Sequence, residues 1–149
     1  ADIQVVGCNL EDQRIGVGGL READDQAERI SAVASAGFHV NARTDIFLDA
    51  MRAGEDPNRE GLVEAAIDRA ARYANAGAGS FFAPGLSDSA LIASLVAAVY
   101  RPVNIMRLPG MDSNADQAAL GVARISYGPG PWREAMDGIE KAARLALSV

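Results

Sequence analysis

The segment ARYANAGAGSFFA, residues 71–83, joins an alanine-rich stretch of helical period to a short apolar stretch through two glycines. We expect Gly77 to end the helix in the left-handed conformation that glycine adopts freely, so that the chain reverses into a strand at Ser80–Ala83. Gly37 and Gly121 stand at the same kind of junction. The repeated helix–glycine–strand pattern is typical of α/β proteins.

Outward from that segment, five short apolar or β-branched segments alternate with longer segments of helical period. The expected strands are Gln4–Leu10, Phe38–Asp45, Ser80–Ala83, Val103–Leu108 and Ala123–Tyr127. The expected helices are Asp24–Ala36, Asn58–Ala76, Ser87–Val99, Asp112–Leu120 and Pro131–Leu147. Continuous apolar strands separated by helices indicate a parallel sheet, because helices cover both of its faces. We therefore expect a single α/β domain over residues 1–149, built from five parallel βα units.

Two architectures fit this order of elements. One is an open, doubly wound sheet of the flavodoxin-like kind, which needs five strands. In that case the chain would be a complete, non-catalytic module that binds a small ligand or a protein. The other is part of a (β/α)₈ TIM barrel that lacks its first three units.

The amino-acid composition argues against nucleic acid, a membrane and zinc as partners of this chain. Fourteen Lys and Arg against 20 Asp and Glu give a net charge of −6, without a basic cluster, which argues against nucleic acid. No apolar run reaches the ~20 residues that span a bilayer, and the first residues, 1–4, lack signal-peptide features. We expect a cytoplasmic protein. One cysteine and one histidine cannot supply a zinc site, so a metal would be a hard cation such as Mg²⁺.

Ligands of both architectures lie at the carboxyl ends of the strands, so the residues that close each strand are the first candidates. Glu11 and Asp12 follow an apolar strand, where a carboxylate can ligate Mg²⁺ or hydrogen-bond a substrate; the alternative is an exposed acidic loop. Arg43 follows a strand that should be buried. Its guanidinium needs an anionic ligand, or else an internal partner such as Glu11 or Asp45.

Other residues that might attract a functional interpretation are better explained structurally. His39 lies near the start of its strand, and Cys8 is expected to be a small core residue. Residues 16–19 resemble a phosphate-binding loop, but no Gly-Lys-Ser/Thr follows, so a mobile lid with glycine hinges is the better interpretation. Trp132 is expected to anchor packing.

Several stretches together resemble the isocitrate lyase/phosphoenolpyruvate mutase superfamily. The matching stretches, in the superfamily's order, are Gly7–Gln13, Asn41–Asp45, Arg69–Ala78, Arg101–Asn104 and Gly121–Ser126. The resemblance implies a TIM barrel that binds Mg²⁺ and a small α-oxo or dicarboxylic acid. It also implies making or breaking of a C–C or P–C bond through an enolate-like intermediate.

The resemblance also implies roles for particular residues. Glu11 matches a glutamate that contacts the metal through water, and Arg43 matches an arginine that binds the substrate carboxylate or developing charge. Asn104, within a matching stretch, and the strand-end Arg107 are further substrate-binding candidates. A gating loop is expected over 14–25, with its candidate residues being Arg14, Gly18, Gly19 and Arg21.

Departures from the superfamily pattern limit what the resemblance implies. Its metal-binding aspartates lie upstream of Ala1, so we expect this chain to hold Mg²⁺ poorly, which leaves its activity in isolation open. The expected gating loop lacks the Cys-Gly-His motif of the lyases. Residues 82–85 lack both the glutamate that the lyases and the histidine that the mutase carry at this strand end. These two departures favour the mutase-like branch. The superfamily's chain usually continues beyond Val149. Two unpaired sheet edges predict a homo-oligomer.

Overall fold

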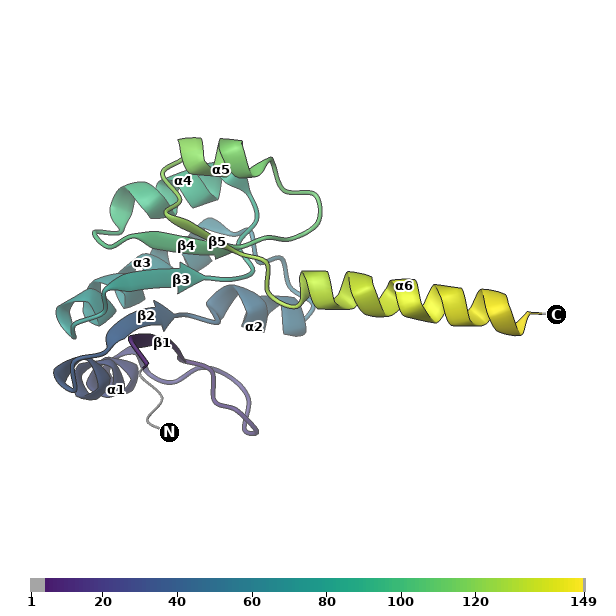
Figure 1. Cartoon of the computed structure of the whole chain (residues 1–149). Helices are drawn as coiled ribbons and strands as arrows, with labels where there is room; N and C mark the ends of the chain where they lie inside the picture. Colours follow the sequence, from purple (N-terminus) through teal and green to yellow (C-terminus); the bar gives the residue numbers. More distant parts are fainter. Residues whose placement is uncertain (1–4, 149) are drawn as a thin grey trace.

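The computed structural model describes residues 5–148. Its strands are β1 (Gly7–Glu11), β2 (His39–Arg43), β3 (Ser80–Ala83), β4 (Val103–Met106) and β5 (Arg124–Ser126). Its helices are α1 (Ala23–Ser35), α2 (Ile46–Arg52), α3 (Glu60–Asn75), α4 (Ser89–Ala98), α5 (Asn114–Ala119) and α6 (Gly130–Leu147). Figure 1 shows strands and helices alternating along the chain, with α2 and α3 in succession after β2.

The five strands form one parallel sheet in the order β1-β2-β3-β4-β5. A doubly wound sheet reverses its strand order at a switch point, whereas in a (β/α)₈ barrel each strand pairs with the next one along the chain. The flavodoxin-like alternative is therefore wrong, and the partial TIM barrel is confirmed. The described residues form five successive units of such a barrel.

Along each strand, successive side chains point alternately to a helix-covered face and to an open face of the sheet. Val40 and Ala42 of β2, with Phe81 of β3, belong to the buried core. That core packs beneath α1, α3 and α4, which lie side by side on one face of the sheet (Figure 1). In a barrel the helices lie outside, so the open face of this sheet corresponds to the barrel interior.

Polar side chains cross the open face from strand to strand. Asn41 Nδ2 donates to Asn9 Oδ1 at 2.7 Å, and Asn41 Oδ1 accepts from Ser80 Oγ at 2.7 Å. Asn104 Nδ2 also donates to Asn41 Oδ1, at 2.5 Å. His39 lies 3.0 Å from Ser80 Oγ at the amino end of the sheet, away from the strand ends that bind ligands, as expected. This network satisfies polar groups that would otherwise be costly to bury.

The expected glycine junctions are confirmed, with positive φ angles of 88° at Gly37, 102° at Gly77 and 91° at Gly121. Two helices also begin with a side-chain N-cap. Asp88 accepts a hydrogen bond from the Leu91 N–H of α4, and Ser113 forms a capping box with Asp116 at α5.

Most other boundaries lie within two residues of the expected ones, and the structure differs from the expectations in three larger respects. The first strand starts at Gly7, where pairing with His39 begins, while the expected start, Gln4, lies outside the described residues. Helix α2 follows β2 almost at once and was not expected. Cys8 is exposed, which corrects the expected core position, because β1 is an edge strand.

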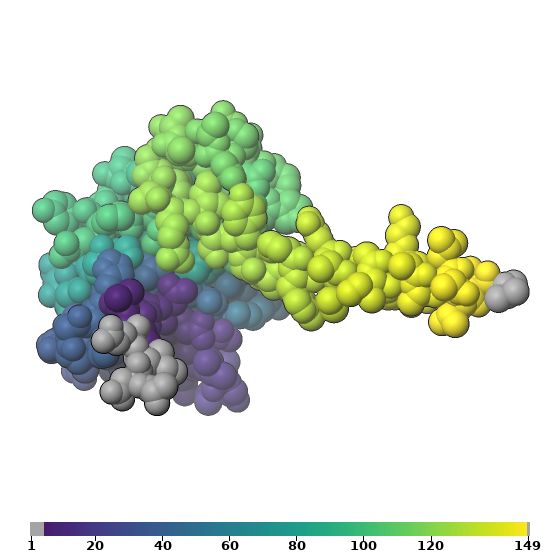
Figure 2. Space-filling model, viewed as in Figure 1, coloured from purple at the N-terminus to yellow at the C-terminus, as the bar shows by residue number. Residues whose placement is uncertain are grey.

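Helix α6 extends away from the sheet, and Figure 2 shows it projecting from the body of the molecule. None of its residues is buried within the described chain. Trp132 is 64% exposed, so within residues 5–148 it does not act as the expected packing anchor. None of the helices in that part of the chain combines the length and apolar composition required to cross a bilayer.

Candidate active site

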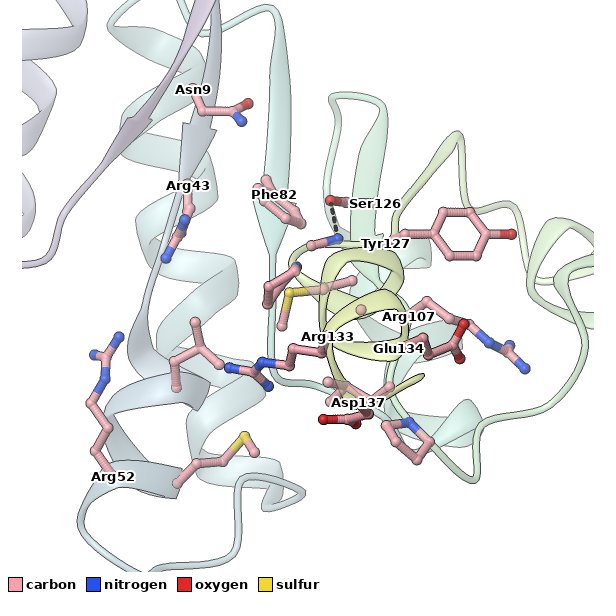
Figure 3. A pocket seen from close by; sticks show the side chains of 18 residues that line it. Asn9, Arg43, Arg52, Phe82, Arg107, Ser126, Tyr127, Arg133, Glu134 and Asp137 are labelled. Atoms are coloured by element: carbon pink, nitrogen blue, oxygen red, sulfur yellow. Dashed lines mark hydrogen bonds between the residues drawn. The ribbon is translucent and has the colours of Figure 1, made fainter. Parts of the chain in front are cut away.

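A cleft of about 830 Å³ opens at the carboxyl ends of the strands, between α2 and the first turns of α6 (Figure 3). Its floor includes Phe82 and Met106 from the open face of the sheet. Four arginines and two carboxylates line it: Arg43, Arg52, Arg107, Arg133, Glu134 and Asp137. Excess positive charge around an apolar floor suits a small anionic ligand.

Arg43 closes β2 at the wall of this cleft. Its Nε and Nη2 donate to Asp45 at 2.5 and 3.0 Å, and its Nη1 lies 3.1 Å from Glu11 Oε2. The alternative in which Arg43 has internal partners is therefore correct, and both named carboxylates take part. Because Asp45 is fully buried, Arg43 also neutralises a charge that would otherwise be costly to bury.

The two internal carboxylates do not use all of the N–H donors of the Arg43 guanidinium. An arginine carries five N–H donors, and the two carboxylates engage only part of that set. The side chain remains 24% exposed toward the cleft, and its Cζ lies 5.9 Å from the centre of the Phe82 ring. The aromatic face and Asp45 together hold the plane of the guanidinium, which leaves its outer edge available to a carboxylate or phosphonate.

The described carboxylates do not by themselves fit a Mg²⁺ site. Glu11, at 29% exposure, is the accessible one near Arg43. Asp12 and Asp45 are fully buried and hydrogen-bonded within the chain. Within residues 5–148 no three His, Cys, Asp or Glu side chains lie close enough to hold a metal. Glu11 could contribute one contact, direct or through water, but not a coordination sphere.

Asp12 has a different environment from its neighbour Glu11. Its Oδ1 accepts from the Asp45 N–H at 2.8 Å. Its Oδ2 accepts from Tyr73 Oη at 2.9 Å and lies 3.2 Å from Arg69 Nη1. Of the two strand-end carboxylates considered for ligand binding, only Glu11 is partly exposed and paired with the cleft residue Arg43, while Asp12 is satisfied inside the protein.

The two further substrate-binding candidates are placed less favourably. Asn104 is only 3% exposed and donates to Asn41 on the open face of the sheet, so it is not at the cleft wall. Arg107 lines the cleft, but its guanidinium donates to the carbonyls of Met111, at 3.0 Å, and Asp112. Arg107 thus ties down the loop after β4. The substrate-binding roles of both residues remain predictions.

Residues 14–20 of the expected gating loop form a short, tight turn that projects beyond β1, while residues 23–25 of it belong to α1. The Arg14 N–H donates to the Gly19 carbonyl at 2.9 Å, and Gln13 and Leu20 form an antiparallel bridge. Gly18 and Gly19 have φ angles of 88° and 68°, so the turn requires glycine there. None of these residues lines the cleft in this conformation.

Arg133 lines the cleft without having been predicted. In Figure 3 its side chain points toward the side of the cleft formed by Arg43 and Arg52, whereas Arg107 and Glu134 point the other way. Within the described chain no carboxylate lies at ion-pair distance from its guanidinium. Strand periodicity could not identify it, because it comes from the first turn of the helix after β5. Its position suits a second contact to an anionic ligand.

Comparison of the sequence with protein families gives one match over almost the whole chain. The family model described as phosphoenolpyruvate phosphomutase matches residues 1–147. An uncharacterized protein of Mycobacterium tuberculosis is 32% identical over 146 residues, which cover 97% of this chain and 52% of that protein. The chain thus spans about half the length of the curated relatives it matches.

Solved structures agree with the sequence comparison. A candidate phosphonomutase from Burkholderia cenocepacia superposes with a TM-score of 0.83 at 42% identity, covering 94% of this chain and 59% of that one. A phosphonopyruvate hydrolase in complex with oxalate and Mg²⁺ has a TM-score of 0.72 at 22% identity, covering 93% and 50%. The second likeness concerns the fold alone. With a family model and a close structural relative both spanning nearly all of its residues, this chain belongs to the phosphoenolpyruvate phosphomutase family.

Proposed function

We propose that this chain supplies the anion-binding part of an active site that acts on a small α-oxo or dicarboxylic acid. The observation that carries the proposal is Arg43, a strand-end arginine held by Glu11 and Asp45 with its outer edge toward a positively charged cleft. The reaction is cleavage or rearrangement of a C–C or P–C bond, as in a lyase, hydrolase or phosphonomutase. A phosphonopyruvate hydrolase of the same fold has been solved with oxalate and Mg²⁺, which supports this substrate class.

The chain's own residues contribute binding and charge stabilisation. Arg43 orients one anionic group of the substrate and stabilises negative charge that develops beside it. Arg133 faces a second anionic group across the cleft. Phe82 excludes water from one side of the site and offers no proton, so it does not act as a general acid or base.

The proposal includes Mg²⁺, which would polarise an oxygen of the substrate when bound. Glu11 would take part through a water molecule, because its carboxylate already pairs with Arg43. The described carboxylates do not complete the site, so no chemical step is assigned to the metal here. We also propose that the protein acts in the cytoplasm as a homo-oligomer.

Calorimetric titration with oxalate, an enolate mimic, in the presence of Mg²⁺ tests the proposal. We expect the protein to bind oxalate and to lose that binding in Arg43→Ala, since a charge-assisted bidentate contact contributes about 2 kcal/mol or more. Arg59→Ala is a matched control, because Arg59 pairs with Glu55 on the exposed surface and does not line the cleft. Absence of oxalate binding by the protein, or equal binding by Arg43→Ala, would contradict the proposed function.

A further inference from the structure

A buried cluster of Asp12, Arg69 and Tyr73 lies directly behind Arg43. Asp12 is fully buried, and so is Tyr73, whose hydroxyl donates to Asp12 Oδ2 at 2.9 Å. Arg69 Nη1 lies within hydrogen-bond distance of both, at 3.2 Å from Asp12 Oδ2 and 2.9 Å from Tyr73 Oη. Helix α3 thereby holds a carboxylate that belongs to the end of β1.

Asp12 is hydrogen-bonded to the backbone of both Arg43 and Asp45. Its N–H donates to the Arg43 carbonyl at 3.1 Å, and its Oδ1 accepts from the Asp45 N–H at 2.8 Å. Asp45 is the residue whose carboxylate fixes the Arg43 guanidinium. The position of Asp12 therefore sets the backbone between Arg43 and the residue that orients the arginine.

The same cluster holds the two ends of the projecting turn, residues 13–20. The Arg21 N–H donates to the Asp12 carbonyl at 2.8 Å, so the two residues that bracket the turn are joined directly. Arg69 Nη1 donates to the Arg21 carbonyl at 3.0 Å. The base of the turn and the Arg43 segment thus share one buried anchor, although they belong to different parts of the chain.

The donor that completes this anchor keeps its proton over the ordinary pH range. Burial, with the neighbouring Asp12 charge, raises the pKa of Tyr73. Its hydroxyl is therefore a permanent donor to the Asp12 carboxylate. Neither Tyr73 nor Arg69 lines the cleft, so any effect of these residues on a ligand must pass through Asp12.

We propose that Asp12, Arg69 and Tyr73 form a positioning cluster that fixes Arg43 and the base of the 13–20 turn as one mechanical unit. This inference rests on the proposed function only for the ligand that Arg43 binds. The coupling between the turn and Arg43 follows from the shared hydrogen bonds and can be measured without any ligand.

Hydrogen exchange of single amides in the intact protein, followed by NMR, tests the coupling. Tyr73→Phe removes one hydroxyl and keeps the aromatic ring, so it is a milder change than truncation of Asp12. We expect exchange of the Arg21 and Asp45 amides to accelerate together, by about tenfold, since one buried hydrogen bond is lost. Ser80→Ala is the matched control, because it removes a buried hydroxyl bonded to Asn41 on the opposite face of the sheet. It should leave both amides within about twofold of their original rates.

A second variant and a ligand measurement complete the test. Arg69→Met keeps the apolar stem and should accelerate the same two amides. Titration of Mg²⁺ and oxalate should show about tenfold weaker binding by Tyr73→Phe and unchanged binding by Ser80→Ala.

Unchanged exchange at Arg21 and Asp45, or acceleration of only one of them, would overturn the coupling. Faster exchange with unaltered oxalate affinity would overturn the positioning role. If the unmodified protein fails to bind oxalate, the proposed function fails, while the exchange measurement still decides the coupling.

Discussion

At the scale of single residues, equal charge does not mean an equal role. Arg43 and Arg107 both follow strands and both line the cleft. Arg43 is held by buried and half-buried carboxylates that leave its outer edge accessible, whereas Arg107 donates to two loop carbonyls. The partners of each guanidinium therefore decide which arginine can receive a ligand.

Arg133→Ala should weaken oxalate binding about fivefold to tenfold, because oxalate carries two carboxylates and Arg133 faces the second. Calorimetry measures the change. Arg107→Ala is the comparison, and we expect a smaller loss of affinity for it because its donors are engaged by carbonyls. Equal losses in the two variants would contradict the assignment of Arg133.

The buried Tyr73 predicts a specific pH dependence of stability. Burial raises its pKa in the folded protein, while an unfolded tyrosine ionises near its ordinary value of about 10. Its contribution is thus fully present below about pH 10 and is lost as the pH rises further, because only the unfolded state releases the proton. Urea unfolding at about pH 8 and about pH 11 should show a larger loss of stability for the unmodified protein than for Tyr73→Phe. An equal loss in both proteins would contradict the assignment.

The candidate site was predictable from sequence only in part. Glu11 and Arg43 were identified because residues that close parallel strands meet at one edge of the sheet. Asp12 satisfied the same rule, but Tyr73 and Arg69 lie 61 and 57 residues further along the chain, and no local pattern indicates that they enclose it. Arg133 was missed because the direction of a helix that leaves a strand end does not follow from periodicity.

At the scale of elements, the helix–glycine–strand junctions and the N-caps determine where units begin and end. These signals are local, which is why all five units were predictable and β3 was predicted to the residue. Helix α2 was not predictable in this way. It has seven residues and starts directly after Asp45, so its helical period is too short to separate from the preceding strand.

Gly77 provides a direct test of a junction. Its φ is 102°, and a Cβ placed on it would meet Ala34 Cβ of α1 at 2.9 Å. Gly77→Ala should therefore lower the free energy of unfolding by about 2–3 kcal/mol, through backbone strain and the clash. Gly37→Ala should cost only about 1 kcal/mol, since its φ is 88° but a Cβ there meets nothing within 4 Å. Urea denaturation measures both, and equal costs would contradict the packing of α1 against this junction.

At the scale of the whole molecule, two features remain without a partner among residues 5–148. The sheet pairs β1 only with β2 and β5 only with β4, so it has two edges. Helix α6 carries an apolar stripe at helical spacing, formed by Trp132, Met136 and Ile139, all exposed. Exposed edges and a continuous apolar stripe both favour association.

We propose that a second copy of the chain covers the α6 stripe. Ile139→Glu should then shift the protein toward the monomer, because a buried charge without a partner opposes association. Sedimentation velocity over a range of concentrations measures the shift. Lys141→Glu is the control, since that residue lies on the opposite side of the same helix. A protein that is monomeric throughout, or that associates equally well with Ile139→Glu, would contradict this arrangement.

The central claim is that Arg43 binds an anionic ligand in a cleft at the carboxyl ends of five barrel strands. The most direct measurement is a crystal structure of the protein grown with Mg²⁺ and oxalate. The account predicts an oxalate oxygen within hydrogen-bond distance of the Arg43 guanidinium, with Asp45 still holding the inner edge of that group. An oxalate bound at another site, with Arg43 contacting only Glu11 and Asp45, would contradict it.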